Sequence, residues 1–335
     1  MFFLKRRLVL MITAIVITMT IGIIVYFSVN AISFYRAHKK CQNVVILRYG
    51  LGNQLFNFAF GYALEKETGS SVCYVKRQPK EHKTHEDDMM KFYRTNAKFT
   101  KFKYGKYAQR YRFLPKTIRQ YLTYFNDSFY KKKESFLFNN DLLKNQKKYN
   151  YYQGLYLNQK YFDKYRKEIV EKLSLNVPID KENQKMLTKI KKHKNSVSIH
   201  IRRGDYLKYE WYRNIVTFDN YYNKALKIFE KMDDVHYFIF SDDPEWVKKN
   251  FKTGKPTTYV NINDVEHGYF DLELMRNCKH NIIANSTLSW WGAYLNENEG
   301  KIVVAPKRYN DRHEINKDML AIGFYPNDWI VIENN

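Results

Sequence analysis

The stretch SVSIHIRRGDY (Ser196–Tyr206) changes from alternating apolar residues to two adjacent arginines, a glycine and an aspartate. The alternation predicts a half-buried strand with His200 and Arg202 on the same face. A guanidinium is always charged and can bind two oxygens of an anion at once. The stretch therefore predicts a strand whose carboxyl end carries an anion-binding loop.

The same order of an apolar strand, polar or glycine residues and a helix recurs elsewhere in the chain. Asn43–Tyr49 is followed by the turn Gly50–Gln54 and by apolar residues at helical spacing, with Gly69 as the expected C-cap. His236–Phe240 and Asn281–Ala284 begin two further units. Open parallel sheets bind ligands at the carboxyl ends of their strands. The pattern therefore predicts an α/β fold with a nucleotide site at that edge.

Length and charge restrict the function further. With 335 residues, two globular units are more probable than one, and 57 Lys+Arg against 34 Asp+Glu give a net charge of +23, which predicts attraction to an anion. The basic, aromatic segment 76–146 contains no recognition motif or zinc spacing, so we expect no nucleic-acid partner. The 3 cysteines allow at most one disulfide.

The N-terminal region predicts a membrane segment. Leu8–Val29 contains no charged residue. As a helix it spans about 33 Å, enough for the core of a bilayer. We therefore expect a basic tail (1–7), a single transmembrane signal-anchor (8–29) and a stem (30–42), with the N-terminus in the cytosol as in a type II protein. The implied location is the Golgi membrane with a lumenal catalytic domain in a eukaryote, or the inner membrane in a bacterium.

Two loops are the strongest candidates for binding a diphosphate. Arg202 and Arg203 can neutralise it without a metal, although Arg202 can instead form an ion pair with Asp205. An adhesion tripeptide at Arg203–Asp205 is disfavoured because the loop continues an apolar strand. Ser286 and Thr287 precede a helix, so their hydroxyls either cap it or, with the backbone amides, bind a phosphate.

Other motifs have simpler structural interpretations. Two glycines at Gly50 and Gly52 are explained by a tight turn, although the amides of the following Asn53 and Gln54 could contact a sugar or a phosphate. Ser241–Pro244 indicates a helix cap before it indicates a metal site. Trp290 and Trp291 are typical of a core more than of a sugar platform. Without an Asp-x-Asp or His-x-x-x-His motif, no metal is expected.

At this point the chain resembles glycosyltransferase family 11, the α-1,2-fucosyltransferases. The resemblance rests on the ordered motifs RYGLGNQLFNFAFGYAL (48–64), HIRRGDY (200–206), FIFSDDPEWVKKNF (238–251), ELMRNCKHNIIANSTLSWWGAYLN (273–296) and VVAPKRY (303–309). It implies a GT-B-like fold of two Rossmann-like domains, 43–195 on the acceptor side and 196–335 on the donor side, facing a nucleotide-sugar cleft. It also implies GDP-fucose as donor, inversion at the anomeric carbon, no cofactor or metal, and transfer to the 2-hydroxyl of a galactose-terminated glycan.

The resemblance also implies roles for individual residues. Arg202, together with Arg203, contacts the β-phosphate, and Asp205 orients them. Asn53, flanked by Gly52 and Gln54, lies near the junction of sugar and phosphate. The residues expected around guanosine and phosphate are Ser241, Asp242, Asn285, Ser286, Thr287 and Ser289, with Asp271 as a further guanine or ribose contact.

The general base stays open among His200, Asp205 and Glu210, or the reaction proceeds with little base assistance. Tyr309 stands where the family pattern leads us to expect tryptophan. Two alternatives are carried forward. One is a fucosyltransferase of the same fold with another linkage or acceptor, and the other is a membrane-anchored glycan- or nucleotide-binding protein without catalysis.

Overall fold

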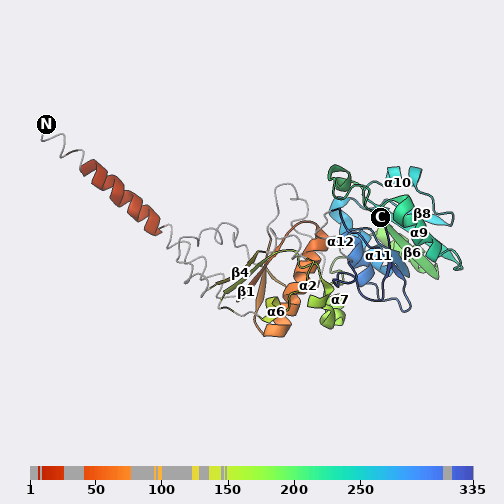
Figure 1. Cartoon of the computed structure of the whole chain (residues 1–335), viewed down its shortest axis with the longest axis horizontal. Helices are drawn as coiled ribbons and strands as arrows, with labels where there is room; N and C mark the ends of the chain where they lie inside the picture. Colours follow the sequence, from red (N-terminus) through yellow and green to blue (C-terminus); the bar gives the residue numbers. More distant parts are fainter. Residues whose placement is uncertain are drawn as a thin grey trace.

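The computed structural model describes residues 7, 10–25, 41–76, 94–95, 97–99, 123–127, 136–144, 147, 149–311 and 319–334, with the backbone alone for 123–127 and 149. Most of the basic segment 76–146 therefore lies outside the described residues. Figure 1 shows the two sheets of the body and a separate N-terminal helix, drawn in red.

The expected membrane anchor at Leu8–Val29 is contradicted. Residues 10–25 form a helix with exposed apolar side chains, among them Leu10 and Ile24. Across the described residues, no helix combines the length and the apolar character that a membrane span needs. The predicted Golgi, inner-membrane and type II locations depend on this anchor and are contradicted with it. Positions 8, 9 and 26–29 of the predicted segment lie outside the described residues.

A five-stranded parallel sheet occupies the first part of the body, in the order β3-β2-β1-β5-β4. Its strands are β1 (Asn43–Leu47), β2 (Val72–Lys76), β3 (Lys98–Phe99), β4 (Thr123–Asp127) and β5 (Tyr149–Gln153). Every residue of β1 is buried, as expected for a central parallel strand covered on both faces. A disulfide joins Cys41 to Cys73, in agreement with the predicted maximum of one, and Cys278 is free and buried.

The second parallel sheet has six strands in the order β11-β10-β9-β6-β7-β8. They are β6 (Asn195–Ile201), β7 (Val235–Ser241), β8 (Thr257–Val260), β9 (His280–Ile282), β10 (Val303–Pro306) and β11 (Ile330–Ile332). The chain runs outward from β6 to β8 and then returns to the other side of β6 with β9. The strand order thus reverses between β6 and β9, which is where doubly wound sheets place their ligands.

One detail of β6 differs from the prediction. The alternating sequence predicts a half-buried strand, but Ser198 and His200 are also buried, at 2% and 4% exposure. The reason is that β6 lies in the middle of a sheet with covered faces, so its polar side chains are enclosed as well.

Helices connect the strands. The α-helices are α2 (Leu51–Thr68), α6 (Asp141–Lys144), α7 (Arg166–Lys172), α8 (Lys181–Lys191), α9 (Asn223–Ile228), α10 (Pro244–Asn250), α11 (Gly268–Asn277) and α12 (Thr287–Tyr294). Shorter turns are η5 (Gln159–Tyr161), η6 (Asp163–Tyr165), η7 (Asp205–Lys208), the π-helical η8 (Phe218–Tyr222) and η9 (Val265–His267). Gly69 ends α2 in the left-handed conformation, as predicted.

Helices α2 and α12 connect the two parts of the body. The ring of Phe56 on α2 lies 4.5 Å from Trp290 and 5.1 Å from Trp291 on α12, between ring centroids. Both tryptophans are 0% exposed, so their predicted place in the core is confirmed. The two sheets follow the expected ranges 43–195 and 196–335 except at Asn195, which opens β6 of the second sheet. The shared core packs across that division, and the boundary itself stays a prediction.

Candidate active site

The carboxyl ends of β6 and β9 bring two polar loops together at the reversal point. Arg202 directly follows β6, and Asn285 and Ser286 follow β9. Their strands are neighbours in the sheet, and the hydroxyl of Tyr206 donates to the carbonyl of Asn285 at 2.9 Å. The predicted edge therefore exists, and both candidate diphosphate loops lie on it.

The guanidinium of Arg202 lies between two carboxylates. Its Nη2 is 2.7 Å from Oδ1 of Asp205 and its Nη1 is 3.1 Å from Oδ2 of Asp242. Desolvation lowers the pKa of Arg202, but these carboxylates outweigh it and raise the pKa above its ordinary value. The ion pair with Asp205 considered from sequence is present, and it leaves the side chain 31% exposed. The two acids thus hold a charged group in a fixed orientation at the edge of the sheet.

Arg203 is directed toward α10 instead. Its Nε is 3.1 Å from Oδ2 of Asp243, and its guanidinium carbon lies 3.1 Å from the ring centroid of Trp246. Asp243 does not cap α10 with its side chain as predicted, because the carboxylate pairs with Arg203; Pro244 does occupy the first turn. This arrangement favours a structural role for Arg203.

Asp242 connects the loops after β6 and β7. Besides its contact with Arg202, its Oδ1 accepts the backbone N–H of Arg203 at 2.8 Å. A Cβ at Gly204 would lie 2.4 Å from Oδ2 of Asp242, so glycine leaves the space that the carboxylate occupies. Asp242, predicted as a nucleotide contact, is thus engaged in positioning the arginine loop.

We expect Asp242→Asn to weaken binding of GDP, the nucleotide that the family resemblance implies, roughly 10- to 100-fold, because hydrogen bonds to charged groups contribute about 1.5–3 kcal/mol. Isothermal titration with GDP measures the change. Glu245→Gln on the neighbouring helix α10 is the matched control, since Glu245 is exposed and its contact to Asn261 is 3.5 Å long. Equal affinities of the two variants would contradict the role of Asp242.

The first turn of α12 lies against Gly52, in the first turn of helix α2. An ideal Cβ on Gly52 would be 2.5 Å from the backbone nitrogen of Leu288 and 2.5 Å from the carbonyl carbon of Thr287. Gly52 therefore allows the two backbones to meet, and the half-buried Asn53 follows it directly. Gln54 is buried and donates to the carbonyl of Tyr49 at 2.7 Å, so its amide supports the turn.

The capping prediction for α12 is only partly right. Ser286 is the N-cap residue, but its hydroxyl forms no capping hydrogen bond, and Thr287 is the first residue of the helix. Instead the hydroxyl of Ser289 accepts the N–H of Ala284 and donates to the carbonyl of Ser286, both at 3.2 Å. Ser289 thus shapes the loop, whereas the Ser286 hydroxyl is not used to cap the helix.

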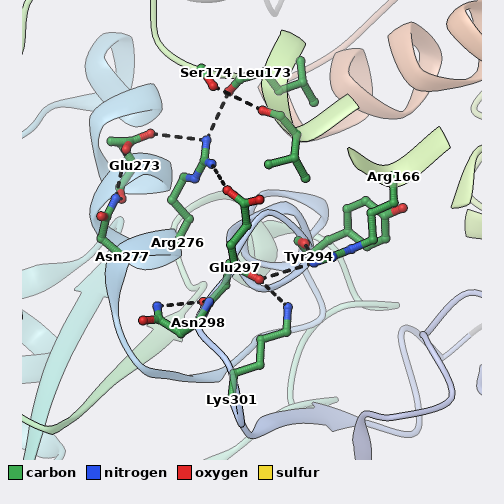
Figure 2. Close-up of polar contacts among 12 residues, drawn as sticks. Arg166, Leu173, Ser174, Glu273, Arg276, Asn277, Tyr294, Glu297, Asn298 and Lys301 are labelled. Atoms are coloured by element: carbon green, nitrogen blue, oxygen red, sulfur yellow. Dashed lines mark hydrogen bonds and ion pairs between the residues drawn. The ribbon is translucent and has the colours of Figure 1, made fainter. Parts of the chain in front are cut away.

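Two cations bind the carbonyls at the other end of α12 (Figure 2). Arg166 donates to the carbonyl of Tyr294 at 2.7 Å, and Lys301 donates to those of Ala293 and Asn296, both at 2.7 Å. Burial lowers the pKa of Lys301 to about 8. Positive charge complements the C-terminal end of a helix dipole. Helix α12 is therefore held at both ends, by the contact with Gly52 at its N-terminus and by these two cations at its C-terminus.

His200 is poorly suited to be the general base. It is 4% exposed, and burial, followed by the charge of Arg202, lowers its pKa to about 3. An imidazole with such a pKa is a weak proton acceptor near neutral pH. Of the three groups considered, His200 is also the least accessible, whereas Asp205 is paired with Arg202 and Glu210 is exposed.

Asp271 belongs to a separate network on α11. Its Oδ1 accepts from Asn263 at 2.8 Å, and Asn263 also exchanges hydrogen bonds with Asn183. Desolvation raises the pKa of Asp271 to about 7. The structure thus links Asp271 to the loop after β8 and to α8, whereas its predicted contact with guanine or ribose stays a prediction.

The raised pKa of Asp271 predicts how the stability of the protein depends on pH. Its folded pKa is raised from 3.8 to about 7, so between these values the folded state holds a proton that the unfolded state has lost, and stability falls as pH rises. Relative to wild type, Asp271→Asn should gain free energy of unfolding between pH 5 and pH 7.5, measured by urea unfolding. The control Asp264→Asn should show no pH-dependent difference over this range, because hydrogen bonding to His267 lowers the pKa of Asp264 below its ordinary value of 3.8, so this carboxyl is ionised in both states. A pH-independent difference for Asp271→Asn would contradict the assignment.

Two site residues carried no signal in the sequence. The hydroxyl of Tyr206 donates to a carbonyl 79 positions away, and the ring of Trp246 on α10 lies against the guanidinium of Arg203. Whole strands and helices separate each of these residues from its partner in the sequence, so no local pattern indicates the two contacts.

Over the part of the chain that the structure describes, no group of three or more His, Cys, Asp or Glu side chains is arranged to bind a metal.

A six-stranded parallel sheet with an arginine and a helix N-terminus at its reversal point places this chain among the α/β proteins, in which open parallel sheets bind ligands at that edge. Residues 43–333 match the family described as Glycosyl transferase family 11. The chain therefore belongs to this family, and the resemblance expected from the motifs is confirmed.

Relatives within the family differ in name. An alpha-1,2-colitosyltransferase of Escherichia coli is 30% identical over 303 residues, covering 87% of this chain and 100% of that protein. WbnK, an O-antigen biosynthesis glycosyltransferase of Escherichia coli, is 41% identical over 37% of this chain and 43% of its own. Human galactoside alpha-(1,2)-fucosyltransferase 1 is 26% identical over 39% of this chain and 38% of its own, so the last two matches span less than half of those proteins.

Among solved structures, a mutant of Arabidopsis thaliana FUT1 in complex with GDP aligns with a TM-score of 0.48 at 11% identity, over 81% of this chain and 74% of that one.

Proposed function

We propose that the protein transfers L-fucose from GDP-fucose to the 2-hydroxyl of a galactose-type residue in a glycan, with inversion at the anomeric carbon. The observation that carries the proposal is that Arg202 and the loop leading into α12 follow neighbouring strands, β6 and β9, at the reversal of the second sheet, where the Tyr206 hydroxyl bonds the carbonyl of Asn285. Membership of family 11 and the α-1,2 linkage named for two relatives support the reaction type.

The diphosphate is bound from two sides in this proposal. Arg202 binds the β-phosphate with a guanidinium that Asp205 and Asp242 already orient. The free amides of the first turn of α12, with the hydroxyls of Ser286 and Thr287, bind the remaining phosphate oxygens. Asn53, next to the contact of Gly52 with α12, lies near the junction of sugar and phosphate, and Ser241 and Asn285 border the nucleoside.

The chemistry follows from this placement. The acceptor oxygen forms a bond to the anomeric carbon while the bond from that carbon to the phosphate oxygen breaks, and GDP leaves with the electron pair. Positive charge develops on fucose and negative charge on the diphosphate, where Arg202 stabilises it. The hydroxyl proton passes to a carboxylate, for which the exposed Glu210 is the candidate, because Asp205 is already paired with Arg202 on the diphosphate side.

A second donor is favoured by one observation. The relative that this chain covers over its whole length is named as a colitosyltransferase. Colitose is L-fucose without its 3-hydroxyl, so the two sugars present the same anomeric carbon and the same leaving group when linked to GDP. A site that makes no hydrogen bond to the 3-hydroxyl accepts both.

Transfer assays with GDP-fucose and GDP-colitose against a panel of β-galactosides test the proposal. We expect an α-1,2-linked product by NMR, with the rate retained in EDTA. Preference for GDP-colitose favours the second donor, and a different linkage overturns the acceptor assignment. Tight GDP binding without turnover of either donor would indicate a binding protein and contradict the enzyme.

A further inference from the structure

A row of aromatic side chains leads away from Arg202. Its guanidinium lies 5.6 Å from the ring centroid of Tyr206, which stacks on Tyr212 at 4.3 Å. Tyr212 is 6.5 Å from Trp211, and Trp211 stacks on Tyr209 at 5.2 Å with an interplanar angle of 25°. Rings contributed by one short segment thus extend from the candidate leaving-group site to the surface.

The outer end of this row is exposed. The side chain of Tyr209 is 41% exposed, whereas the core tryptophan Trp290 is 0% exposed. Burying a large aromatic ring is strongly favourable, and the exposed part of Tyr209 does not contribute this energy to the core. Packing in the core therefore does not account for the position of this ring. Glu210, its neighbour in the chain, is also exposed.

The segment is nevertheless held in place. The N–H of Leu207 donates to the carbonyl of Arg203 at 2.9 Å, and Arg213 donates through Nη2 to the carbonyl of Leu207 at 2.9 Å. The carbonyl of Trp211 accepts the N–H of Asp311 at 2.8 Å. The exposed ring is therefore presented on a fixed backbone, and binding a ligand there costs little ordering of the chain.

We propose that the stacked pair Tyr209 and Trp211 is the platform for the acceptor sugar, with the outward face of Tyr209 against the apolar face of a galactose-type ring. The inference rests on the proposed transferase function, because it uses Arg202 to locate the reacting carbon. An acceptor must approach the anomeric carbon from the side opposite the diphosphate.

The chemistry of the two partners matches. Galactose has one face made of C–H groups, since its axial 4-hydroxyl lies on the other side of the ring. An aromatic side chain offers a flat apolar surface with, in tyrosine, a hydroxyl at its edge that can bond to a sugar hydroxyl. The carboxylate of Glu210 beside the platform can accept a further hydroxyl.

Steady-state kinetics of Tyr209→Leu, Tyr209→Phe and Trp211→Leu test the platform. Leucine keeps apolar bulk but removes the flat ring, so Tyr209→Leu should raise the KM for a β-galactoside roughly tenfold. Phenylalanine keeps the ring and should restore most of this loss. Neither change at position 209 should alter the dissociation constant for GDP, measured by calorimetry, which also reports whether each variant is folded.

Three results separate the possible failures. An unchanged acceptor KM in both leucine variants overturns the platform while leaving the transferase intact. Equal losses in GDP affinity and acceptor KM overturn it as well, because they indicate a structural role for the loop. Absence of transfer by the wild-type protein contradicts the proposed function itself; saturation-transfer NMR of a β-galactoside on the GDP-loaded protein then decides the platform, which is wrong if Tyr209→Leu leaves the signal unchanged.

Discussion

The variant Arg202→Ala is expected to lower kcat/KM for sugar transfer by roughly 10²- to 10³-fold, because it removes one hydrogen-bond donor to a developing negative charge. The loss has two sources. The guanidinium that we propose to stabilise departing GDP is gone, and the carboxylates of Asp205 and Asp242 lose the cation that lies within 2.7 and 3.1 Å of them. Both effects place uncompensated negative charge beside the diphosphate.

Transfer rates at saturating acceptor, together with GDP titration, measure this effect. Arg202→Lys should recover part of the loss, because lysine keeps the charge but cannot bind two oxygens in one plane. Lys185→Ala removes an exposed cation on α8 and serves as the control. Undiminished transfer by Arg202→Ala would remove Arg202 from the site and with it the central step of the proposed function.

Alanine at position 52 is expected to destabilise the protein by about 1–3 kcal/mol, as other insertions into packed regions do, and to weaken GDP binding. The new Cβ would lie 2.5 Å from backbone atoms of Thr287 and Leu288, which cannot rotate away as a side chain could. The N-terminus of α12 must then move from α2, and the proposed phosphate-binding amides move with it.

Gly50→Ala is the matched control two positions earlier. A Cβ there meets nothing within 4 Å, and the φ of −65° suits any residue. Urea unfolding and GDP titration of the two alanine variants should therefore differ clearly. If Gly52→Ala behaved like Gly50→Ala, the close contact between α2 and α12 would be wrong.

The local chemistry of the chain was largely predictable. Strand and helix units, the left-handed Gly69, the buried Trp290 and Trp291, and an arginine at the end of β6 all follow from patterns within a few residues. The ordered motifs also indicated the family. The apolar N-terminal stretch was misleading, because apolar composition alone does not establish a membrane span.

The sequence by itself determined which groups lie at the ends of strands, because the periodicity of apolar residues reports on neighbours along the chain. Only the tertiary structure decided what those groups do: Arg203 pairs with Asp243 while Arg202 stays accessible, His200 is enclosed, and Gly52 meets Thr287. The physical reason is distance along the chain. Asp242 is 39 positions from Arg203, and such contacts arise from the order of strands in the sheet, which no local pattern records.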